Sequence, residues 1–440
     1  MKILVLDIYK DVNYRISKDT SGGYGTGNNF GDGIFTSFLK KKFKKEHDWP
    51  PLFLAYTHSV LKSNGHEVFY SKILEDDFNK YDCFILSSSI VCCENEIEII
   101  KKIRSQTDKK IFSIGPFATS NPKKYIEAGS FVISGEPEFY FLQNKDLNIG
   151  ENNKIIKFNH KFDVDDLPFP LWDEIVKDFT KVSNLFGRYK NIPILGTRGC
   201  PYSCFNYCVY PLQQGRKVRQ RNPKYIVDEM EYWVKKGITM FTFRDPVFSI
   251  NRKHTLEFCD EMKNRNLKCY FIIETHLRIL DKELINKLKE IGLKAVKVGV
   301  ESFDEDVLKD ANRFTIKKDE QLSKIRELEN KNIQVSAMFI IGFPKDTYSS
   351  INKTISYAKK INSTYSQFSV WTPYPGTPIY ENFKDKITAK KFEDFDQYQL
   401  VYKHDLFNKD QIRKLLNKSY NSYYLRINWV SKYIKSFINA

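Results

Sequence analysis

Short apolar runs alternate with amphipathic stretches through the first 145 residues of the chain. The apolar runs end at turn residues and predict buried strands, and the stretches with helical periodicity predict single helices between them. Strands joined by single helices predict a mostly parallel, doubly wound, Rossmann-like α/β sheet. The predicted strands are Ile3–Asp7, Glu67–Tyr70, Cys83–Ser87, Lys110–Ile114 and Phe131–Ser134, and the predicted helices are Pro51–Ser63, Glu94–Ser105 and Pro122–Ala128.

A second alternation of apolar runs and helical stretches begins near residue 191. Six successive strand–helix units predict a partial (β/α)6 barrel that is TIM-like, with its chemistry at the carboxyl ends of the strands. The predicted strands are Ile192–Thr197, Ile238–Phe243, Cys269–Ile273, Ala295–Val300, Gln334–Ile341 and Gln367–Thr372, and the predicted helices are Lys224–Lys235, His254–Asn264, Lys282–Ile291, Asp319–Asn330 and Ser349–Lys360.

The same pattern divides the chain into four parts. Residues 1–145 form the doubly wound domain, 146–190 a polar linker with a proline cluster, 191–375 the barrel, and 376–440 a small helical C-terminal region. One stretch in the first part, Ser21–Asn29, is rich in glycine and follows the first strand. Long excursions of this kind are usually either functional or disordered, and we favour function because this one falls at the end of the strand where ligands of doubly wound sheets bind.

Composition and charge narrow the class of protein. Hydrophobic residues make up 41% and charged residues 28% of the chain, which is typical of a globular protein, and no apolar run approaches the ~18 residues of a membrane span. The first residues form a strand rather than a signal peptide, so we expect a cytoplasmic protein. The net charge of +16 permits nucleic-acid binding. The densest basic cluster, at residues 40–48, is more typical of a solvated face, and we do not expect a nucleic-acid partner.

Eight cysteines in such a chain do not indicate a disulfide framework. Five lie in or beside apolar segments, where free cysteine acts as a small hydrophobe. Cys200, Cys204 and Cys208 lie within nine residues, in the loop that follows the first barrel strand. Three converging thiolates repel one another unless a cation lies between them, so we expect a metal site. Structural zinc takes four ligands, whereas three ligands on a four-iron cluster leave one iron open. The five core cysteines are Cys83, Cys92, Cys93, Cys259 and Cys269.

This loop resembles the signature of the radical S-adenosylmethionine (SAM) superfamily, Cys-x3-Cys-x2-Cys with an aromatic residue before the third cysteine. Tyr207-Cys208 matches that ending, although Asn206 makes the spacing here Cys-x3-Cys-x3-Cys. Further landmarks of the family follow in order at the ends of the later strands. They are Phe243–Phe248, Glu274 with Arg278, Val298–Ser302, Ile340–Pro344 and Thr372–Thr377.

The resemblance implies a [4Fe-4S] cluster on the three cysteines and SAM on its open iron. It implies contacts to SAM from Asp245, Glu274, Arg278 and Glu301. One electron would cleave the sulfonium bond and give a 5′-deoxyadenosyl radical, which abstracts hydrogen from a small-molecule substrate while the barrel excludes water. An electron donor such as flavodoxin or ferredoxin is then an expected partner.

The doubly wound domain before this barrel resembles that of the cobalamin-binding subfamily. In the subfamily the serine and glycine strand ends line the cobalamin, because small side chains let the backbone approach the ring and its tail. The resemblance assigns this role to Ser87, Ser88, Gly115, Gly135 and Glu136. No Asp-x-His-x-x-Gly motif is present, so we expect no histidine ligand to cobalt.

The expected function is therefore that of a radical SAM enzyme that uses cobalamin for methylation, or another radical modification, of a metabolite or natural-product precursor. Two alternatives stay open. One is a radical SAM enzyme similar to the tRNA methylthiotransferases, which the positive charge favours. Members of that family carry a second set of cluster cysteines in the N-terminal domain and a small β-rich RNA-binding domain at the C-terminus. The other is a zinc-stabilised nucleic-acid-binding protein without enzymatic activity, in which a distant fourth ligand completes the site of Cys200, Cys204 and Cys208.

Overall fold

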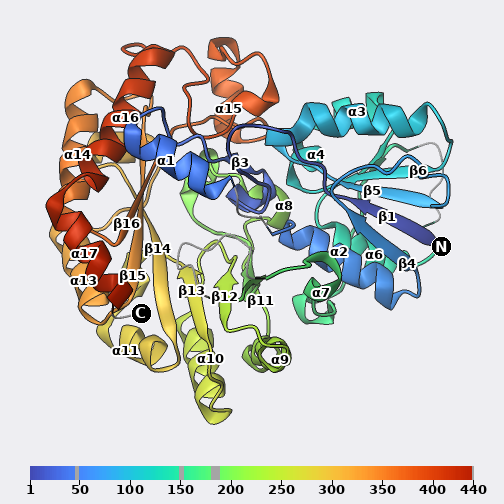
Figure 1. Cartoon of the computed structure of the whole chain (residues 1–440), viewed down its shortest axis with the longest axis horizontal. Helices are drawn as coiled ribbons and strands as arrows, with labels where there is room; N and C mark the ends of the chain where they lie inside the picture. The colour runs from blue at the N-terminus through green and yellow to red at the C-terminus, as the bar shows by residue number, and fades with distance from the viewer. Residues whose placement is uncertain (45–48, 148–152, 180–188, 439–440) are drawn as a thin grey trace.

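The computed structural model describes residues 1–44, 49–147, 153–179 and 189–438 (Figure 1). Residues 45–48 of the basic cluster and parts of the predicted linker, 148–152 and 180–188, lie outside these ranges. The described chain contains two six-stranded parallel sheets and a helical C-terminal region. The α/β fold class with parallel-sheet domains and a helical C-terminal region is therefore confirmed.

The first sheet has the order β4-β1-β5-β6-β7-β8, and all its strands are parallel. Successive residues of β1 point to opposite faces: Ile3 and Val5 pack with α2, and Leu4 and Leu6 pack with α3. Both faces are therefore apolar and covered by helices, as the sequence predicted. The elements are β1 (Lys2–Leu6), β4 (Glu67–Ser71), β5 (Cys83–Ser87), β6 (Lys110–Ile114), β7 (Phe131–Ile133), β8 (Ile155–Ile156), α2 (Leu52–Ser63), α3 (Cys93–Arg104), α4 (Pro116–Ser120), α5 (Pro122–Glu127) and α6 (Pro137–Gln143).

The second sheet has the order β16-β15-β14-β13-β12-β9, again with all strands parallel. Its helices lie on the outer face, which gives the predicted partial barrel (Figure 1). The elements are β9 (Asn191–Ile194), β12 (Met240–Phe243), β13 (Tyr270–Glu274), β14 (Leu293–Glu301), β15 (Gln334–Ile341), β16 (Tyr365–Val370), α9 (Pro223–Lys235), α10 (Arg252–Asn264), α11 (Lys282–Glu290), α12 (Glu305–Asp310), α13 (Lys318–Asn330) and α14 (Tyr348–Ile361).

The remaining elements connect or cap the two sheets. The glycine-rich excursion forms a small hairpin at the carboxyl edge of the first sheet and continues into α1, which packs on α16. Helix α1 was not predicted, because its Lys40–Lys42 run weakens the apolar periodicity of its sequence. These elements are β2 (Ile16–Ser17), β3 (Thr26–Gly27), α1 (Ile34–Phe43), α7 (Trp172–Ile175), β10 (Thr197–Arg198), α8 (Tyr210–Gln214), β11 (Arg219–Gln220), α15 (Pro378–Phe383), α16 (Lys409–Tyr424) and α17 (Ile427–Ile438).

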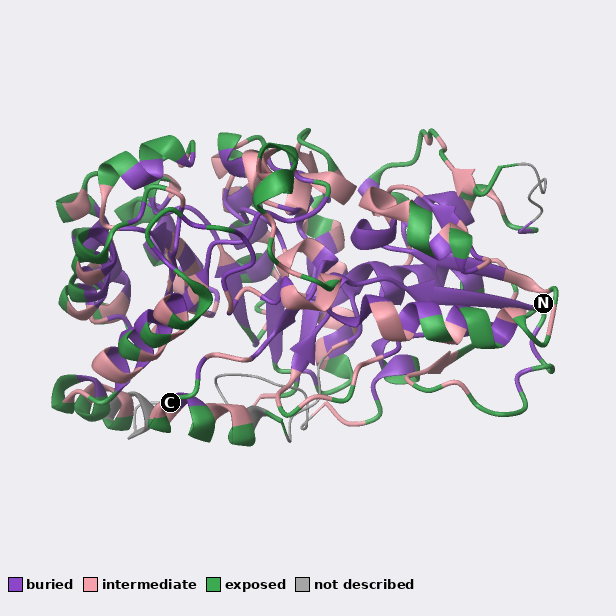
Figure 2. Ribbon diagram, turned by 90° about the horizontal axis from the view of Figure 1, so that it is seen from above, coloured by how far each residue is buried: buried purple, intermediate pink, exposed green. Residues whose placement is uncertain are grey.

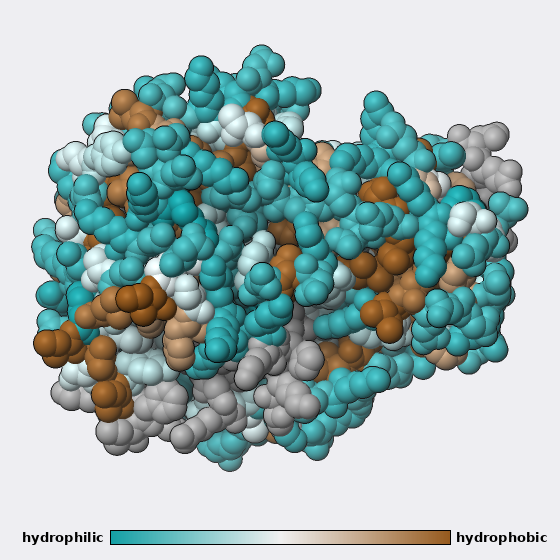
Figure 3. Space-filling model, turned by 45° about the horizontal axis from the view of Figure 1, so that its top comes forward, coloured by the Kyte–Doolittle hydropathy of each residue, from teal (hydrophilic) through white to brown (hydrophobic). Residues whose placement is uncertain are grey.

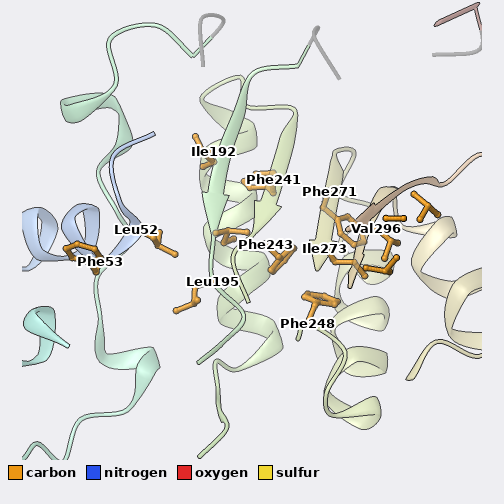
Figure 4. Close-up of a cluster of buried hydrophobic side chains, with 14 of the residues drawn as sticks. Leu52, Phe53, Ile192, Leu195, Phe241, Phe243, Phe248, Phe271, Ile273 and Val296 are labelled. Carbon is orange, nitrogen blue, oxygen red and sulfur yellow. The ribbon is translucent and has the colours of Figure 1, made fainter. Parts of the chain in front are cut away.

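One hydrophobic core joins the two sheets. Leu52 and Phe53 of α2 lie toward Leu195, beside the phenylalanines of the barrel strands (Figure 4). The strands are buried along most of their length, and exposure is concentrated on the outer sides of the helices and in loops (Figure 2). Within the described ranges, no helix combines the length and the apolar character needed to cross a bilayer.

Candidate metal and cofactor site

The three loop cysteines lie together at the carboxyl end of the barrel. The loop leaves β9, forms the short strand β10 and then makes a single 3-10 turn, Ser203–Asn206. Cys200 and Cys204 are buried and Cys208 is partly exposed, and all three are free thiols. The backbone N–H of Cys208 donates to the carbonyl oxygen of Cys204 at 3.0 Å, so the turn brings the second and third cysteines close.

The charges of the three thiols influence one another. Burial raises the pKa of Cys208, and the charges of Cys204 and Cys200 raise it further. Burial and Cys204 also raise the pKa of Cys200. Within the described residues, no three His, Cys, Asp or Glu side chains are already arranged as a metal site. A cluster would therefore require the three thiols to turn toward one another, and its positive irons would offset the burial and the repulsion that raise the pKa values of Cys200 and Cys208.

Arg313 connects the cysteine loop to the fourth barrel strand. Its Nη1 donates to the Cys204 Sγ at 3.7 Å, and its Nη2 donates to the Gly299 carbonyl oxygen at 3.2 Å. The same Nη2 lies 3.4 Å from Oε1 of Glu301. A single partly buried guanidinium thus contacts a sulfur and a carboxylate that were predicted to serve the cluster and SAM, respectively.

Glu301 itself lies in a strained conformation. Its φ is 63°, a value that non-glycine residues rarely adopt, and the register with β15 shifts between Gly299 and Glu301. Burial raises the pKa of its carboxyl group. Bulges and left-handed residues of this kind concentrate at functional sites, where they redirect a side chain. The bulge here turns Glu301 toward Arg313.

Asp245 is fully buried and holds the base of the cysteine loop. Its Oδ1 accepts from the Gly196 N–H at 2.7 Å and its Oδ2 accepts from the Thr197 hydroxyl at 3.0 Å. Burial raises the pKa of this carboxyl group to about 7. Both carboxylate oxygens therefore have protein partners, and the residue positions the loop that carries the cysteines.

A group of charged side chains lies in the interior of the barrel next to this loop. Arg244 lies 2.8 Å from the carboxylate of Asp19, which precedes the glycine-rich excursion. Glu274 and Lys297 lie on neighbouring strands and interact electrostatically with each other and with Arg244. Burial, together with the positive charge of Arg244, lowers the pKa of Lys297 to about 8. Asp19, Arg244 and Tyr210 form part of the wall of a small pocket of about 40 Å³.

A second, small pocket, of about 10 Å³, lies beside the bulge of β14. Its lining includes Gly299, Arg313 and the rings of His276 and Phe314. Arg278, one of the predicted SAM contacts, lies at its margin, exposed, with its guanidinium 4.6 Å from the Phe314 ring centre. The pocket is lined by aromatic rings, by the glycine backbone at Gly299 and by the cationic side chain of Arg313.

At the edge of the first sheet, the predicted cobalamin residues already have protein partners. Ser87 Oγ donates to Asp7 at 2.8 Å, and Ser88 Oγ accepts from the Ala118 N–H at 2.9 Å. Gly115 has a φ of 108°, and a Cβ there would lie 2.6 Å from Phe53, so only glycine fits. The space beside these small side chains is therefore filled by other residues of the chain and is not open.

The segment that leads into the glycine-rich excursion covers this edge through a fully buried lysine. Lys18 Nζ lies 2.8 Å from Glu96 and 3.5 Å from Asp7, and all three side chains are inaccessible to solvent. Burial opposes the charge of Lys18, but Glu96 and Asp7 outweigh it and raise its pKa. Farther along the excursion, Gly22 has a φ of 59° and a Cβ there would lie 3.1 Å from the Tyr210 backbone. Residues 16–27 therefore contact both the first sheet and the segment that follows the cysteines.

Glu136 lies between the two domains. Its Oε1 accepts from Arg198 at 2.5 Å and its Oε2 lies 2.8 Å from Arg219. Glu138 lies 2.5 Å from the same Arg198 nitrogen, which is buried with both carboxylates. Gly135 precedes them beside open space. The predicted residues Gly135 and Glu136 thus meet the cysteine loop, because Arg198 precedes Cys200 by two residues.

The structure brings together the cysteines, Asp245, Glu274 and Glu301 around the carboxyl end of the barrel, with Arg278 at its margin. It places Ser87, Ser88 and Gly115 apart from them, at the other sheet. No sequence signal indicated Arg313, which belongs to no motif, or Arg198. Lys297, by contrast, directly precedes a predicted motif and interrupts an apolar strand, a signal that was present in the sequence.

Comparison with known families agrees with the cysteine loop. Residues 194–358 match the model of the radical SAM superfamily, which confirms the resemblance stated from the sequence. The chain is 26% identical over 415 residues to an uncharacterized methyltransferase of Pyrococcus horikoshii, covering 86% of this chain and 88% of that protein. It is 25% identical over 374 residues to the bacteriochlorophyllide d C-8(2)-methyltransferase of Chlorobaculum tepidum, covering 81% and 80% of the two chains.

Among solved structures, the fold is similar to that of the radical SAM methyltransferase TsrM of Kitasatospora setae. The TM-score is 0.63 at 17% identity, covering 87% of this chain and 78% of that one. That structure holds cobalamin and a [4Fe-4S] cluster, and another structure of the same enzyme holds tryptophan and a SAM analogue. A match over this share of the chain extends across both parallel sheets, so the two-domain arrangement is shared.

Proposed function

We propose, on the premise that residues 194–358 form a radical SAM domain, that the chain is an enzyme that cleaves SAM reductively and modifies a small molecule by radical chemistry, with methylation as the favoured outcome. The observation that carries the proposal is the set of Cys200, Cys204 and Cys208 at the carboxyl end of the barrel, linked through Arg313 to the bulge of β14.

The donor set fits a [4Fe-4S] cluster. The three thiols are free, adjacent and supplied by one loop, and three ligands leave one iron open. When bound, such a cluster supplies the electron that cleaves SAM to a 5′-deoxyadenosyl radical, which abstracts hydrogen from the substrate. The chain's own part is to hold and shield: Asp245 fixes the start of the loop, and Arg313 offsets the negative charge of Cys204 and Glu301.

We place the nucleoside of SAM beside the bulge of β14, where the small pocket would have to widen to admit it. The His276 and Phe314 rings line this pocket and offer faces for stacking, whereas Glu301 and Arg313 fill the space beside Gly299. Glu274 and Glu301, on the neighbouring strands β13 and β14, would accept hydrogen bonds from the amino group and the ribose hydroxyls of SAM. We assign Asp245 to positioning the loop rather than to direct contact with SAM.

Cobalamin is the second cofactor of the proposal, on the likeness to TsrM and to methyltransferase relatives. As the chain is folded here, Ser87, Ser88 and Gly115 do not offer a cradle, because residues 16–27 and Phe53 cover them. A cobalamin tail at this edge would therefore require residues 16–27 to leave it and expose Lys18.

The charged interior of the barrel favours a hydrophilic substrate. Arg244 and Lys297 supply positive charge, and Asp19 and Glu274 supply negative charge, in the same part of the interior. Groups of both signs suit a zwitterionic or multiply hydroxylated metabolite or natural-product precursor better than an apolar one. An electron donor such as flavodoxin or ferredoxin completes the proposed system.

Anaerobic reconstitution with iron and sulfide, followed by SAM and a chemical reductant, tests the proposal. We expect about four irons per chain and formation of 5′-deoxyadenosine that disappears in Cys204→Ala. Cys259→Ala, at a buried cysteine of α10 outside the loop, is the matched control and retains both. One zinc per chain and no 5′-deoxyadenosine would contradict the proposal and favour the zinc-stabilised alternative.

The structure gives no support to the methylthiotransferase alternative. Cys83, Cys92 and Cys93, the cysteines of the N-terminal domain, are completely buried in its core, where they pack against apolar side chains rather than face a site. The C-terminal region is formed by α16 and α17, not by the small β-rich domain that this alternative implies.

A further inference from the structure

The last helix of the chain, α17, exposes its apolar side. Ile427 is 86% exposed, Val430 44% and Ile434 54%. Spacings of three, four and seven residues place these side chains on one stripe of the helix. The opposite side is anchored, since Trp429 is buried and its Nε1 donates to the Thr364 carbonyl oxygen at 2.9 Å. The stripe is therefore held outward by a fixed helix.

Exposed apolar residues of α1 extend this surface. Phe35 stacks on Tyr424 with ring centres 4.5 Å apart, which joins the start of α1 to the junction of α16 and α17. Next to this contact, Ile34 is 84% exposed and Leu425 is 58% exposed. Phe38, one helical turn after Ile34, is 62% exposed. In Figure 3 hydrophobic side chains gather at the left of the molecule, the side on which Figure 1 shows α14, α16 and α17.

A basic groove borders the stripe. An open groove of about 640 Å³ runs between α13, α14 and α17. Its lining carries five cationic side chains and a single carboxylate, that of Glu329, which lies 3.1 Å from Lys432. The cationic residues are Arg326, Lys359, Lys360, Arg426 and Lys432.

From this pairing of an outward apolar stripe with a basic groove, we propose that α17, with the start of α1, docks the protein on an anionic lipid bilayer. An interfacial helix buries its apolar side at the boundary of the acyl chains while cations beside it contact the headgroups. The apolar stripe of α17 and the basic groove beside it are arranged in this way. This inference is independent of the chemistry proposed for the barrel.

Two other occupants fit the surface less well. A second copy of the chain, related by a two-fold axis, would bring the same groove against itself and place like charges together. A nucleic acid would use the cations but would leave Ile427 and Ile434 exposed to water. An anionic bilayer satisfies both the charge and the apolar stripe.

Flotation of the full-length protein with vesicles tests the proposal. We expect it to float with vesicles of phosphatidylcholine and phosphatidylglycerol, to stay behind with phosphatidylcholine alone, and to be released by salt. The double substitution Ile427→Gln and Ile434→Gln should reduce binding at least about tenfold, and so should Lys359→Glu with Lys360→Glu.

Matched controls use exposed residues away from α17. Ile73→Gln, at a 70% exposed isoleucine of the N-terminal domain, and Lys253→Glu, at an exposed lysine of α10, should bind like the unchanged protein. Unaltered circular dichroism and 5′-deoxyadenosine formation in the α17 variants would exclude misfolding. Absence of binding to anionic vesicles, equal loss in the controls, or a dimer that dissociates in the isoleucine variant would overturn the proposal.

Discussion

Replacing Lys18 by methionine should destabilise the N-terminal domain strongly. Methionine retains most of the length of the side chain but removes the charge that Glu96 and Asp7 share. Asp7 keeps three hydroxyl donors, from Tyr9, Tyr70 and Ser87, whereas Glu96 loses its buried cation. Removing one partner of a buried ion pair typically lowers the free energy of unfolding by about 3–5 kcal/mol, and we expect a loss in this range.

The second substitution, Glu96→Gln, separates the charge effect from simple loss of packing. Its amide oxygen can still accept from Ser89 and Tyr125, the partners of Glu96 in the structure. In the double variant Lys18→Met and Glu96→Gln, Asp7 is the one carboxylate of the group that still carries a charge, and it keeps its three hydroxyl donors, so at least half of the lost stability should return. The assay is urea unfolding by circular dichroism, with hydrogen exchange at β1 and β5 to identify the N-terminal transition. A loss below about 1 kcal/mol in the single variant, or a double variant as unstable as the single one, would refute this reasoning.

The site and its surroundings yield three further predictions. In Arg313→Lys, the shorter side chain cannot contact Cys204, Glu301 and the β14 carbonyl at once. The rate of 5′-deoxyadenosine formation should therefore fall about 10- to 100-fold at unchanged iron content, and an unchanged rate would contradict the bridging role of Arg313. Burial raises the pKa of Asp396 to about 7. The folded protein therefore holds a proton that the unfolded chain releases near pH 4, and the free energy of unfolding falls as pH rises from about 4 to about 7. In Asp396→Asn this fall, about 4 kcal/mol in total, should disappear from the pH dependence of urea unfolding. Finally, loading with hydroxocobalamin should increase proteolysis within residues 16–27, and corrinoid binding without such an increase would place the tail elsewhere.

The order of strands and the position of the cysteine loop could be predicted from the sequence, because both depend on local patterns. Cys200 falls at the end of the first apolar run of the barrel, and the two sheets are buried enough on both faces to give clear apolar strands. The role of Asp245 could not be predicted in the same way. It depends on the register that pairs Phe243 with Ile194, which places Asp245 beside Gly196 on the neighbouring strand.

Contacts between segments distant in sequence explain why the other residues of the site could not be predicted. Arg313 reaches Cys204 across 109 positions, and no local pattern distinguishes it from the surface arginines. Glu96 could have been noticed, since it falls on the apolar side of α3 with Ile100 and Ile103. A carboxylate in such a position predicts a buried counter-ion, but its partner, Lys18, lies beside a glycine-rich segment without periodicity.

The ion pairs of Glu136 and Glu138 with Arg198 make the cysteine loop of the barrel dependent on the N-terminal domain. A chain shortened to residues 191–440 would retain every cysteine of the loop, yet the guanidinium two positions before Cys200 would lose both of its buried counter-ions. The face of Leu195 that α2 now covers would be open to water as well. Folding of the cysteine loop therefore depends on both domains, and, on the proposed function, a substitution in the acidic pair of the N-terminal domain should lower iron retention although it changes no cysteine.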